Sequence, residues 1–460
     1  MKGTNEQNGH DRDPRKTPAR AALASWVGSV LEYYDFFIYG TAAALVFGQV
    51  FFPESDPATG TLLSFATYGV GYVARPIGAF FMGHIGDRYG RKRVLLLTVT
   101  LMGIATFLVG CLPTYDDIGI WAPVLLVALR LLQGFSASGE QSGANSLSLE
   151  HAPEHRRAFF TSFTLSGTQT GLIIATAIFL PIGAMPEDQL LSWGWRVPFW
   201  LSAIVVVVGL IIRRRIEEPP AFRREAAEQE DAHVPVAMLL RDHWPAVLRV
   251  VLAALASTVS TIFAVYALNF AVDTHGLDQT TMLWVAIAAN VVALASIPAW
   301  ATLSDRIGRR PVFIFGAVAS GGLMFAYLGA IEAGGYPLIF LTAILMSGVV
   351  YSAMNGIQPS LYGEMFPTRV RLSGMAIGTQ IGYAIGGFAP TAAAAIAGDG
   401  ADGWVPVAVY VLVSTLIAAA AVATARETYK VPLAVIDGRD EAAPSRARSA
   451  PGELSRAGVS

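Results

Sequence analysis

The stretch GDRYGRK at residues 86–92 decides the architecture, because it returns as SDRIGRR at residues 304–310. The second copy begins 218 positions after the first (304 minus 86). A second pair of motifs, EHAP at 150–153 and EMFP at 364–367, is separated by 214 positions (364 minus 150). Two independent motifs at nearly one period predict a duplicated protein with two similar halves.

The composition places these halves in a membrane. The chain has 460 residues, of which 53% are hydrophobic and only 14% are charged, with a mean hydropathy of +0.50. Ordinary soluble domains carry about 25% charged residues. This chain therefore lacks the charge for a water-facing surface of its size, which excludes a soluble enzyme. The net charge of −2 gives no general attraction to nucleic acid. The single cysteine, Cys111, permits no internal disulfide.

Apolar stretches of membrane-spanning length, about 20 residues each, recur along the chain. Each is predicted to be an α-helix, because hydrocarbon offers the backbone no hydrogen-bond partner and the alternating pattern of barrel strands is absent. The predicted fold is an all-α membrane protein with twelve transmembrane helices in two six-helix pseudo-repeats. The predicted helices lie near 21–47, 59–84, 93–112, 119–145, 158–183, 196–213, 244–271, 281–303, 312–332, 336–362, 371–397 and 404–424.

Charged loops predict the orientation. With the N-terminus inside the cell, the basic clusters around residues 88–93, 156–157, 213–215, 306–310 and 369–371 all fall on the cytoplasmic side. The opposite loops are acidic. We expect a multi-pass protein of the cell membrane with both termini cytoplasmic, functional as a monomer within the lipid bilayer.

The same reading divides the chain into five parts. Residues 1–20 form a cytoplasmic tail, 21–213 the first six-helix half, 214–243 a charged cytoplasmic linker, 244–426 the second half and 427–460 a disordered cytoplasmic tail.

Charged residues inside the predicted helices are few, and each costs roughly 2.5 to 3.5 kcal/mol on insertion scales. The predicted proton-coupling residues are Glu32, Asp35, Arg75, Arg130 and Glu140. Three acids against two arginines leave one surplus negative charge, so one acid can take up a proton. Glu32 or Asp35 is the preferred site. The alternative is that fixed ion pairs only hold the helices together.

Polar residues on the same helices are the candidate solute ligands. Arg130 and Gln141, eleven positions apart, are expected on nearly one helix face. The amides of the second half are expected to form the opposite wall, or else simple bonds between helices. The predicted solute-binding residues are Tyr39, Arg75, Arg130, Gln141, Asn269, Asn355, Gln358, Gln380 and Tyr383.

The repeated loops resemble the signature of the major facilitator superfamily. A narrower similarity, to the metabolite:proton symporter family, is carried by LEYYDFFIYG at 31–40, ARPIG at 74–78, RLLQG at 130–134 and WGWRVPF at 193–199. The chain departs from that family at residues 138–143, where SGEQSG replaces a GGEWGG run.

The resemblance implies a proton-coupled symporter that imports a small organic acid, such as a dicarboxylate, alpha-ketoglutarate or a shikimate-like compound, by alternating access. Two alternatives stay open. One is a proton symporter for a zwitterionic solute such as betaine or proline, and the other is a substrate-sensing membrane receptor on a transporter fold.

The resemblance also implies that the repeated loops lock a cytoplasmic gate, while their position near the surface excludes contact with a midplane solute. The predicted gate residues are Asp87, Arg88, Gly90, Arg91, Glu150, Asp305, Arg306, Gly308, Arg309 and Glu364. No enzymatic site, cofactor or metal is expected, since no Walker loop occurs and the pair His151 and His155 has no third ligand nearby.

Overall fold

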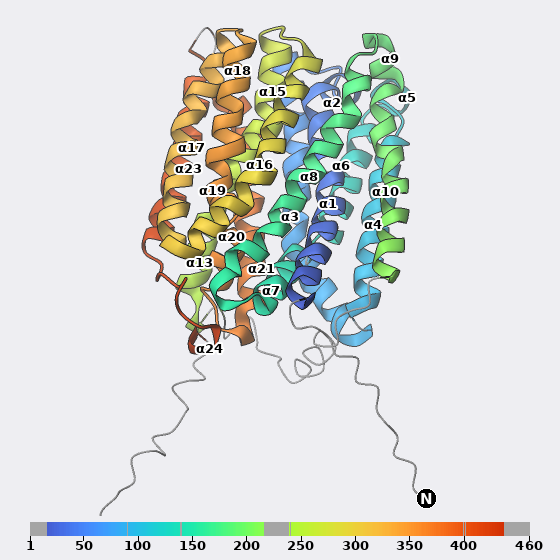
Figure 1. Ribbon diagram of the computed structural model, residues 1–460. Helices are drawn as coiled ribbons and strands as arrows, with labels where there is room; N and C mark the ends of the chain where they lie inside the picture. The colour runs from blue at the N-terminus through green and yellow to red at the C-terminus, as the bar shows by residue number, and fades with distance from the viewer. Residues whose placement is uncertain are drawn as a thin grey trace, which may run out of the picture.

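The computed structural model describes residues 16–89, 91–138, 140–215, 239, 241–398, 400 and 402–436. Every regular element in these ranges is helical. The long helices stand side by side as one upright bundle (Figure 1). We call the end of the bundle that carries Lys16 and the short helix α24 (Leu433–Ile436) the α24 end, and the opposite end the α9 end.

The first half contains six long helical stretches. Its elements are α1 (Lys16–Leu45), α2 (Phe47–Phe51), α3 (Pro57–Tyr89), α4 (Arg91–Gly110), α5 (Tyr115–Ile118), α6 (Trp121–Ser136), α7 (Glu140–His151), α8 (Arg157–Gly183), α9 (Glu187–Ser192) and α10 (Val197–Arg215). Helices α6 and α7 together make one of the six stretches.

The second half repeats this plan with more interruptions. Its elements are α13 (Trp244–Ala254), α14 (Thr258–Thr261), α15 (Ala267–Asn269), α16 (Gln279–Ile307), α17 (Arg309–Glu332), α18 (Tyr336–Ala343), α19 (Ser352–Asn355), α20 (Gln358–Gly363), α21 (Thr368–Gly387), α22 (Ala389–Ile396) and α23 (Val405–Ala423). Wider π-helical turns, η5 (Ile262–Tyr266), η6 (Phe270–Thr274) and η7 (Ile344–Tyr351), interrupt the first and fourth stretches of this half. Such turns are frequent at functional sites.

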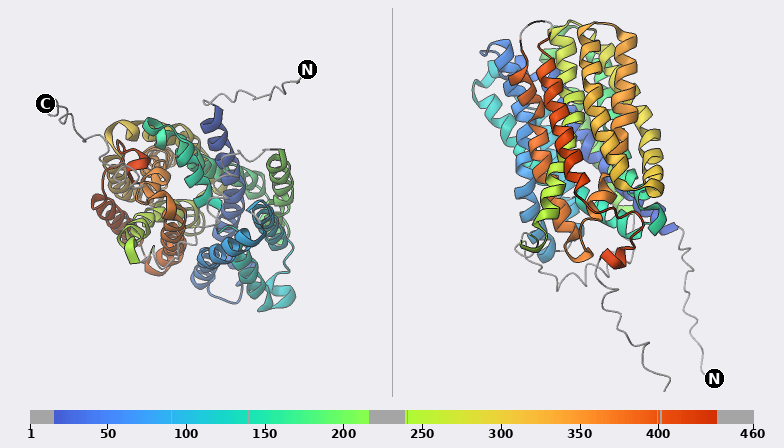
Figure 2. Two further views of the ribbon diagram at one scale, coloured as in Figure 1. Left: turned by 90° about the horizontal axis from the view of Figure 1, so that it is seen from below. Right: turned by 90° about the vertical axis from the view of Figure 1, so that its left-hand side faces the viewer.

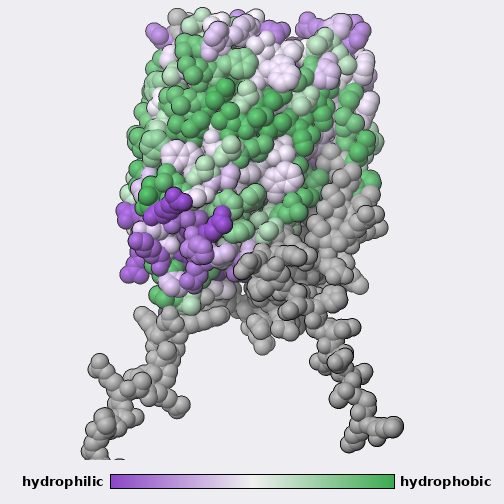
Figure 3. All heavy atoms as spheres, in the orientation of Figure 1, coloured by the Kyte–Doolittle hydropathy of each residue, from purple (hydrophilic) through white to green (hydrophobic). Residues whose placement is uncertain are grey.

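These elements confirm the predicted twelve-helix architecture. Each predicted apolar stretch coincides with a helical stretch whose ends lie within about five residues of the prediction. Six stretches in the described part of the chain are long and apolar enough to cross a membrane by length and composition alone, namely 154–183, 244–274, 279–307, 309–332, 336–363 and 405–423. On the face seen in Figure 3, hydrophobic residues cover most of the middle, and polar residues gather at the top and at the lower left.

The two halves meet along a few helices. Viewed along the bundle axis, helices coloured blue and cyan lie on one side and those coloured yellow-green to red on the other (Figure 2). The main contacts between halves join α8 with α16 and α3 with α21. The interface between the halves is therefore bordered by α1, α3 and α8 on one side and by α16, α21 and the π-helical turn η5 on the other.

Helices α3 and α6 approach so closely that only glycine fits between them. A Cβ atom on Gly134 would lie 1.7 Å from the carbonyl oxygen of Gly71, and one on Gly78 would lie 2.2 Å from the carbonyl oxygen of Phe135. This close packing carries Arg75 of α3 and Arg130 of α6 into the interior of the first half, where both are fully buried.

The segment after the last long helix lies against the bundle. The predicted disordered tail begins at residue 427, yet residues 427–436 are in place and include α24. Two guanidinium bonds explain this, because Arg157 donates to the carbonyl oxygens of Val431 at 3.0 Å and Thr428 at 2.9 Å. Parts of the predicted tails and of the predicted linker lie outside the described residues. These parts are residues 1–15 and 437–460 of the tails, and residues 216–238 and 240 of the linker.

Candidate solute, proton and gate sites

The buried charges of the first half form one ion pair. Glu32 of α1 and Arg75 of α3 approach to 3.1 Å, and both side chains are shielded from solvent. The attraction between the two charges offsets part of the cost of burying each of them. Glu32 and Arg75, both predicted as proton-coupling residues, are therefore brought together.

A phenyl ring lies between the two buried arginines. The Cζ atom of Arg75 lies 4.1 Å from the ring centroid of Phe36, and that of Arg130 lies 4.3 Å from the same centroid. Arg75 also faces the ring of Tyr72 at 4.9 Å. Cation–π contacts of this kind stabilise a desolvated guanidinium.

Arg130 is held by neutral groups. Its Nη1 donates to Oε1 of Gln133 at 3.1 Å, and its Nη2 donates to the carbonyl oxygen of Tyr68 at 3.5 Å. Its guanidinium lies 4.1 Å from the ring of Tyr39 and 5.2 Å from that of Tyr68.

Asp35 is a buried carboxyl without a close cation. Its side chain is 3% exposed, and among the described residues it forms no ion pair within 4.0 Å, while its Oδ1 has no hydrogen-bond partner. The side chain of Glu140 lies outside the described residues. Asp35 and Glu32, three residues apart on one helix, therefore sit in different environments.

A cavity lies between the two halves, next to these charges. It offers about 60 Å³ to the centres of water molecules, and one water needs roughly 10 to 15 Å³ by this measure. None of the described residues that line it is charged. Its walls are aromatic, hydroxyl and amide side chains with two leucines. The lining residues are Tyr33, Phe37, Tyr68, Tyr72, Gln141, Leu165, Thr168, Gln169, Leu172, Ser257, Ser260, Thr261, Phe263, Asn290, Ser347, Tyr351, Asn355, Gln358 and Tyr383.

Four of the predicted solute-binding residues line this cavity, namely Gln141, Asn355, Gln358 and Tyr383. The other five do not. Arg75 and Arg130 lie one ring behind the wall, since Tyr72 and Tyr68, which they face, line the cavity. Tyr39 donates its hydroxyl to Thr67 inside the first half.

The remaining two lie elsewhere in the second half. Asn269 donates to the carbonyl oxygen of Ala44 at 3.0 Å across the halves and also to Asp273. Gln380 is 1% exposed and its Oε1 has no hydrogen-bond partner among the described residues.

The expected common face of Arg130 and Gln141 is wrong. Helix α6 ends at Ser136 and α7 begins at Glu140, so the two residues belong to separate helices. Ala137 closes α6 by donating its backbone N–H to Gln133. As a result Gln141 lines the cavity and Arg130 does not.

Sequence reasoning missed most of the cavity's first-half wall. Tyr68, Tyr72 and Gln169 occur in apolar helices with no charge or repeated motif to mark them. Tyr33 follows Glu32 directly, and that charged neighbour is the sequence signal that points to it.

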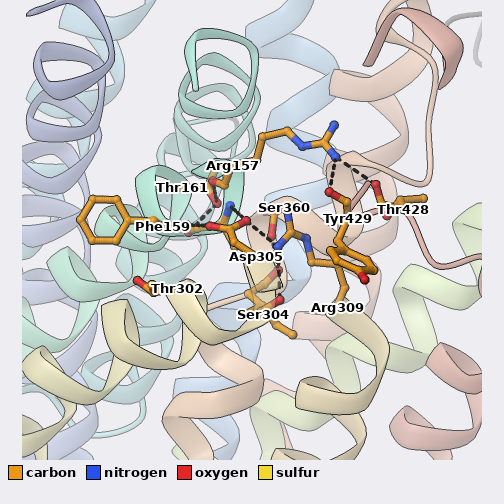
Figure 4. Close-up of polar contacts among 12 residues, drawn as sticks. Arg157, Phe159, Thr161, Thr302, Ser304, Asp305, Arg309, Ser360, Thr428 and Tyr429 are labelled. Carbon is orange, nitrogen blue, oxygen red and sulfur yellow. Dashed lines mark hydrogen bonds and ion pairs between the residues drawn. The ribbon is translucent and has the colours of Figure 1, made fainter. Parts of the chain in front are cut away.

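At the α24 end, Glu364 joins the two halves. Its carboxylate lies 3.1 Å from Arg157 of the first half and 3.2 Å from Arg309 of the second. Arg309 also lies 2.7 Å from Asp305. Asp305 in turn accepts hydrogen bonds from the backbone N–H groups of Ala158 at 3.1 Å and Phe159 at 3.0 Å (Figure 4). A carboxylate at these groups, the first turn of α8, also faces the positive end of the helix dipole.

A second ion pair crosses the same end. Glu150 of α7 and Arg371 of α21 approach to 3.2 Å. Each acid precedes the arginine of its own half by seven positions, Glu150 before Arg157 and Glu364 before Arg371. Each pairs with the arginine of the other half. Arg157 and Arg371 were predicted only as residues that set the orientation.

The side chains of the second copy of the repeated loop are described, whereas the first copy is described only in its backbone on either side of Gly90. Gly308 adopts φ +113°, a conformation that favours glycine, and a Cβ there would lie 2.7 Å from Oε2 of Glu427. Glu427 accepts from the backbone N–H of Arg309 at 2.9 Å. Arg306 is exposed. Gly90 and the side chains of Asp87, Arg88 and Arg91 lie outside the described residues.

Comparisons with known proteins agree with this architecture. The family model described as "Sugar (and other) transporter" matches twice, over residues 21–241 and 226–437. The crystal structure of a D-xylose-proton symporter superposes with a TM-score of 0.68 at 18% identity, covering 87% of this chain and 97% of that one. An inward open conformation of the xylose transporter XylE from E. coli gives a TM-score of 0.66 at 18% identity, covering 91% and 98%. These structures share the fold.

Curated relatives are closer in sequence. The shikimate transporter of Escherichia coli (strain K12) is 39% identical over 405 residues, which cover 87% of this chain and 92% of the relative. The proline/betaine transporter of the same strain is 33% identical over 314 residues, covering 65% of this chain and 62% of that relative.

The twelve-helix fold with a cavity between its halves therefore defines a secondary transporter of the major facilitator superfamily and not an enzyme. The chain belongs to the "Sugar (and other) transporter" family, and its relatives include a shikimate transporter and a proline/betaine transporter. It is a multi-pass membrane protein.

Proposed function

We propose that this transporter imports a small organic acid together with a proton, by alternating access to the cavity between its halves. The observation that carries the proposal is that two arginines lie just behind the aromatic wall of the cavity. Arg75 and Arg130 lie directly behind Tyr72 and Tyr68, two aromatic rings of an otherwise uncharged cavity wall. Because Glu32 neutralises Arg75, the uncompensated charge is that of Arg130, and it favours an anionic solute when Asp35 is protonated.

The same contacts argue against a quaternary ammonium as the solute. An aromatic cage binds such a cation through the faces of its rings. The rings of Tyr68 and Tyr72 already have a guanidinium nearby. The greater identity and coverage of the shikimate transporter relative to the proline/betaine transporter also support a hydroxylated acid. Hydroxyl and amide groups in the wall suit hydroxylated carboxylates.

Asp35 is the proposed site of the coupling proton. Four of the five predicted proton-coupling residues have described side chains, and these four, Glu32, Asp35, Arg75 and Arg130, carry no net charge together when both acids are ionised. A proton on Asp35 removes a buried charge that has no ion-pair partner among the described residues and leaves a net charge of one positive unit. That charge balances a monocarboxylate. Glu32 serves this purpose less well because its ionised form is held by Arg75.

The network at the α24 end is the proposed cytoplasmic gate. Glu364 and Arg157, like Glu150 and Arg371, join the halves there, so this end cannot open while both pairs are intact. Basic residues cluster at the same end, including Arg156, Arg306 and Arg310. An excess of arginine marks the cytoplasmic side of a membrane protein. Both termini of the chain then lie in the cytoplasm.

Counterflow in liposomes tests the function. Purified protein is loaded with unlabelled shikimate, and exchange of labelled shikimate is measured against an excess of alpha-ketoglutarate, proline or glycine betaine, with and without an acidic exterior. We expect competition by organic acids and faster uptake from the acidic side. Competition by betaine and proline alone would identify a zwitterion carrier instead. Binding without any exchange would indicate a sensor.

A further inference from the structure

Two tyrosine–glutamine pairs face each other across the cavity, one from each half. In the first half, the hydroxyl of Tyr33 on α1 donates to Oε1 of Gln141 on α7 at 2.8 Å. In the second half, the hydroxyl of Tyr383 on α21 donates to Oε1 of Gln358 on α20 at 3.3 Å. All four side chains line the same cavity.

A phenol that donates to the amide oxygen fixes which way the amide is turned. Each glutamine oxygen then already accepts one hydrogen bond, and the NH₂ group is left pointing away from the tyrosine with its donors available to another molecule. The two tyrosines thus orient two NH₂ groups as donors for the cavity. That of Gln141 comes from the first half, and that of Gln358 comes from the second.

Gln358 shows that one of these donors lacks a partner. The side chain is 3% exposed, and its Nε2 has no hydrogen-bond partner among the described residues. A buried donor without an acceptor costs free energy, so such groups are rare unless they serve a ligand. Since no described residue supplies an acceptor to it, a solute or water in the cavity is the group that would satisfy it.

We propose that the amide nitrogens of Gln141 and Gln358 together bind the carboxylate of the transported solute, and that Tyr33 and Tyr383 are positioning residues that keep those nitrogens turned towards it. This inference rests on the proposed function, since it identifies the part of the organic acid that the cavity recognises. A carboxylate has two oxygen atoms and no donor, which matches two NH₂ groups.

The arrangement has a mechanistic consequence. Because the two amides belong to opposite halves, one carboxylate satisfies both only when the halves have closed around it. Recognition and occlusion of the solute are therefore one event. Arg75 remains paired with Glu32 throughout, so no buried ion pair is broken to bind the anion.

Uptake kinetics of single and double variants test the clamp. The variants are Gln358→Leu, Tyr383→Phe and the double variant, with labelled shikimate as the solute. We expect Gln358→Leu to raise the transport KM roughly tenfold to a hundredfold, as expected from the loss of a hydrogen bond to a charged group, with a much smaller change in Vmax. Tyr383→Phe raises the KM less.

The double variant separates positioning from direct binding. If Tyr383 acts only by orienting Gln358, its loss has no further effect once the amide is gone, so the double variant matches Gln358→Leu. Tyr327→Phe is the matched control, because Tyr327 is a buried tyrosine that does not line this cavity. Gln358→Glu keeps the size of the side chain and should raise the KM at least as far, since a carboxylate repels the solute.

Two further comparisons keep the inference distinct from the proposed function. The carboxamide analogue of the solute should inhibit shikimate uptake poorly in wild type. In Gln358→Leu the analogue and the free acid should inhibit uptake about equally. Unchanged KM values in folded Gln358→Leu and Gln358→Glu would overturn the clamp while wild-type acid uptake still stands. If wild type exchanges only betaine, the proposed function fails, and the same variants measured with betaine, which also carries a carboxylate, decide on the clamp.

Discussion

Glu150 and Arg371 belong to opposite halves of the chain, and their side chains approach to 3.2 Å at the α24 end. Their counterparts one repeat apart, Glu364 and Arg157, make the reciprocal contact at 3.1 Å. The duplicated sequence thus builds its own lock, because the acid of each half binds the arginine of the other. This reciprocity is the basis for the gate assigned to that end.

Removing one charge of the lock should open this end. Glu150→Gln leaves the buried Arg371 without its carboxylate, at a cost of about 1 to 3 kcal/mol. That cost shifts the population towards an inward-open state by roughly 5-fold to 150-fold. The measurement is the labelling rate of a cysteine at Asn355, which lines the cavity, in a Cys111→Ser background. A membrane-impermeant reagent is added from the α24 side.

Glu54→Gln is the matched control for this experiment. Glu54 accepts a hydrogen bond from Tyr115 within the first half and is exposed. It should leave the labelling rate unchanged. Equal rates in wild type and Glu150→Gln would mean that the ion pair does not hold the gate.

Neutralising the proposed proton site should uncouple transport. Asp35→Asn keeps the size of the side chain and removes the proton that it would carry. We expect solute exchange at equal pH to persist, and accumulation driven by an acidic exterior to fall towards the equilibrium level. The pH dependence of uptake, measured between about pH 5 and 8 in liposomes, reports the difference. Accumulation equal to that of wild type would exclude Asp35 as the coupling site.

Glu32→Gln should behave differently from Asp35→Asn. It leaves Arg75 buried beside a neutral group, and breaking a buried ion pair in this way costs about 3 to 5 kcal/mol. We expect a lower thermal unfolding temperature in detergent as well as weaker uptake. A variant as stable as wild type would show that the pair has little structural role.

Close helix packing in the first half can be tested with one methyl group. Gly134→Ala would place a Cβ 1.7 Å from the carbonyl oxygen of Gly71, so α3 and α6 must separate. Overpacking of this kind typically costs about 1 to 3 kcal/mol or more. The control Gly322→Ala adds a Cβ with no atom within 4 Å. Thermal unfolding should distinguish the two, and equal unfolding temperatures would contradict the packing.

The ring between the two arginines provides a further test of stability. Phe36→Leu removes both cation–π contacts, at 4.1 and 4.3 Å, and should cost about 1 to 4 kcal/mol. The comparison is Phe340→Leu. Its ring is partly buried, and no cation contacts it in the described part of the chain. The prediction fails if both variants lower the unfolding temperature equally.

Much of the fold followed from the sequence, because hydrophobic runs long enough to span a bilayer have few other stable structures. The gate motifs were visible too, since their spacing repeats. The pairing of Glu150 with Arg371 was not visible in the sequence, because the spacing does not show that each acid pairs with the arginine of the other half. The break at Ala137, which separates Arg130 from Gln141, depends on local backbone geometry that helical periodicity does not report. Tyr68 and Tyr72 were missed since tyrosine in an apolar helix looks like ordinary packing.

Proton movement driven by the solute tests the central claim most directly. Wild-type protein is reconstituted in liposomes with equal pH on both sides, shikimate is added outside, and external pH and labelled solute are recorded together. A symporter takes up protons with the solute, so the external medium becomes more alkaline in proportion to uptake, and a protonophore removes the change. Solute uptake with no accompanying proton movement would contradict the account.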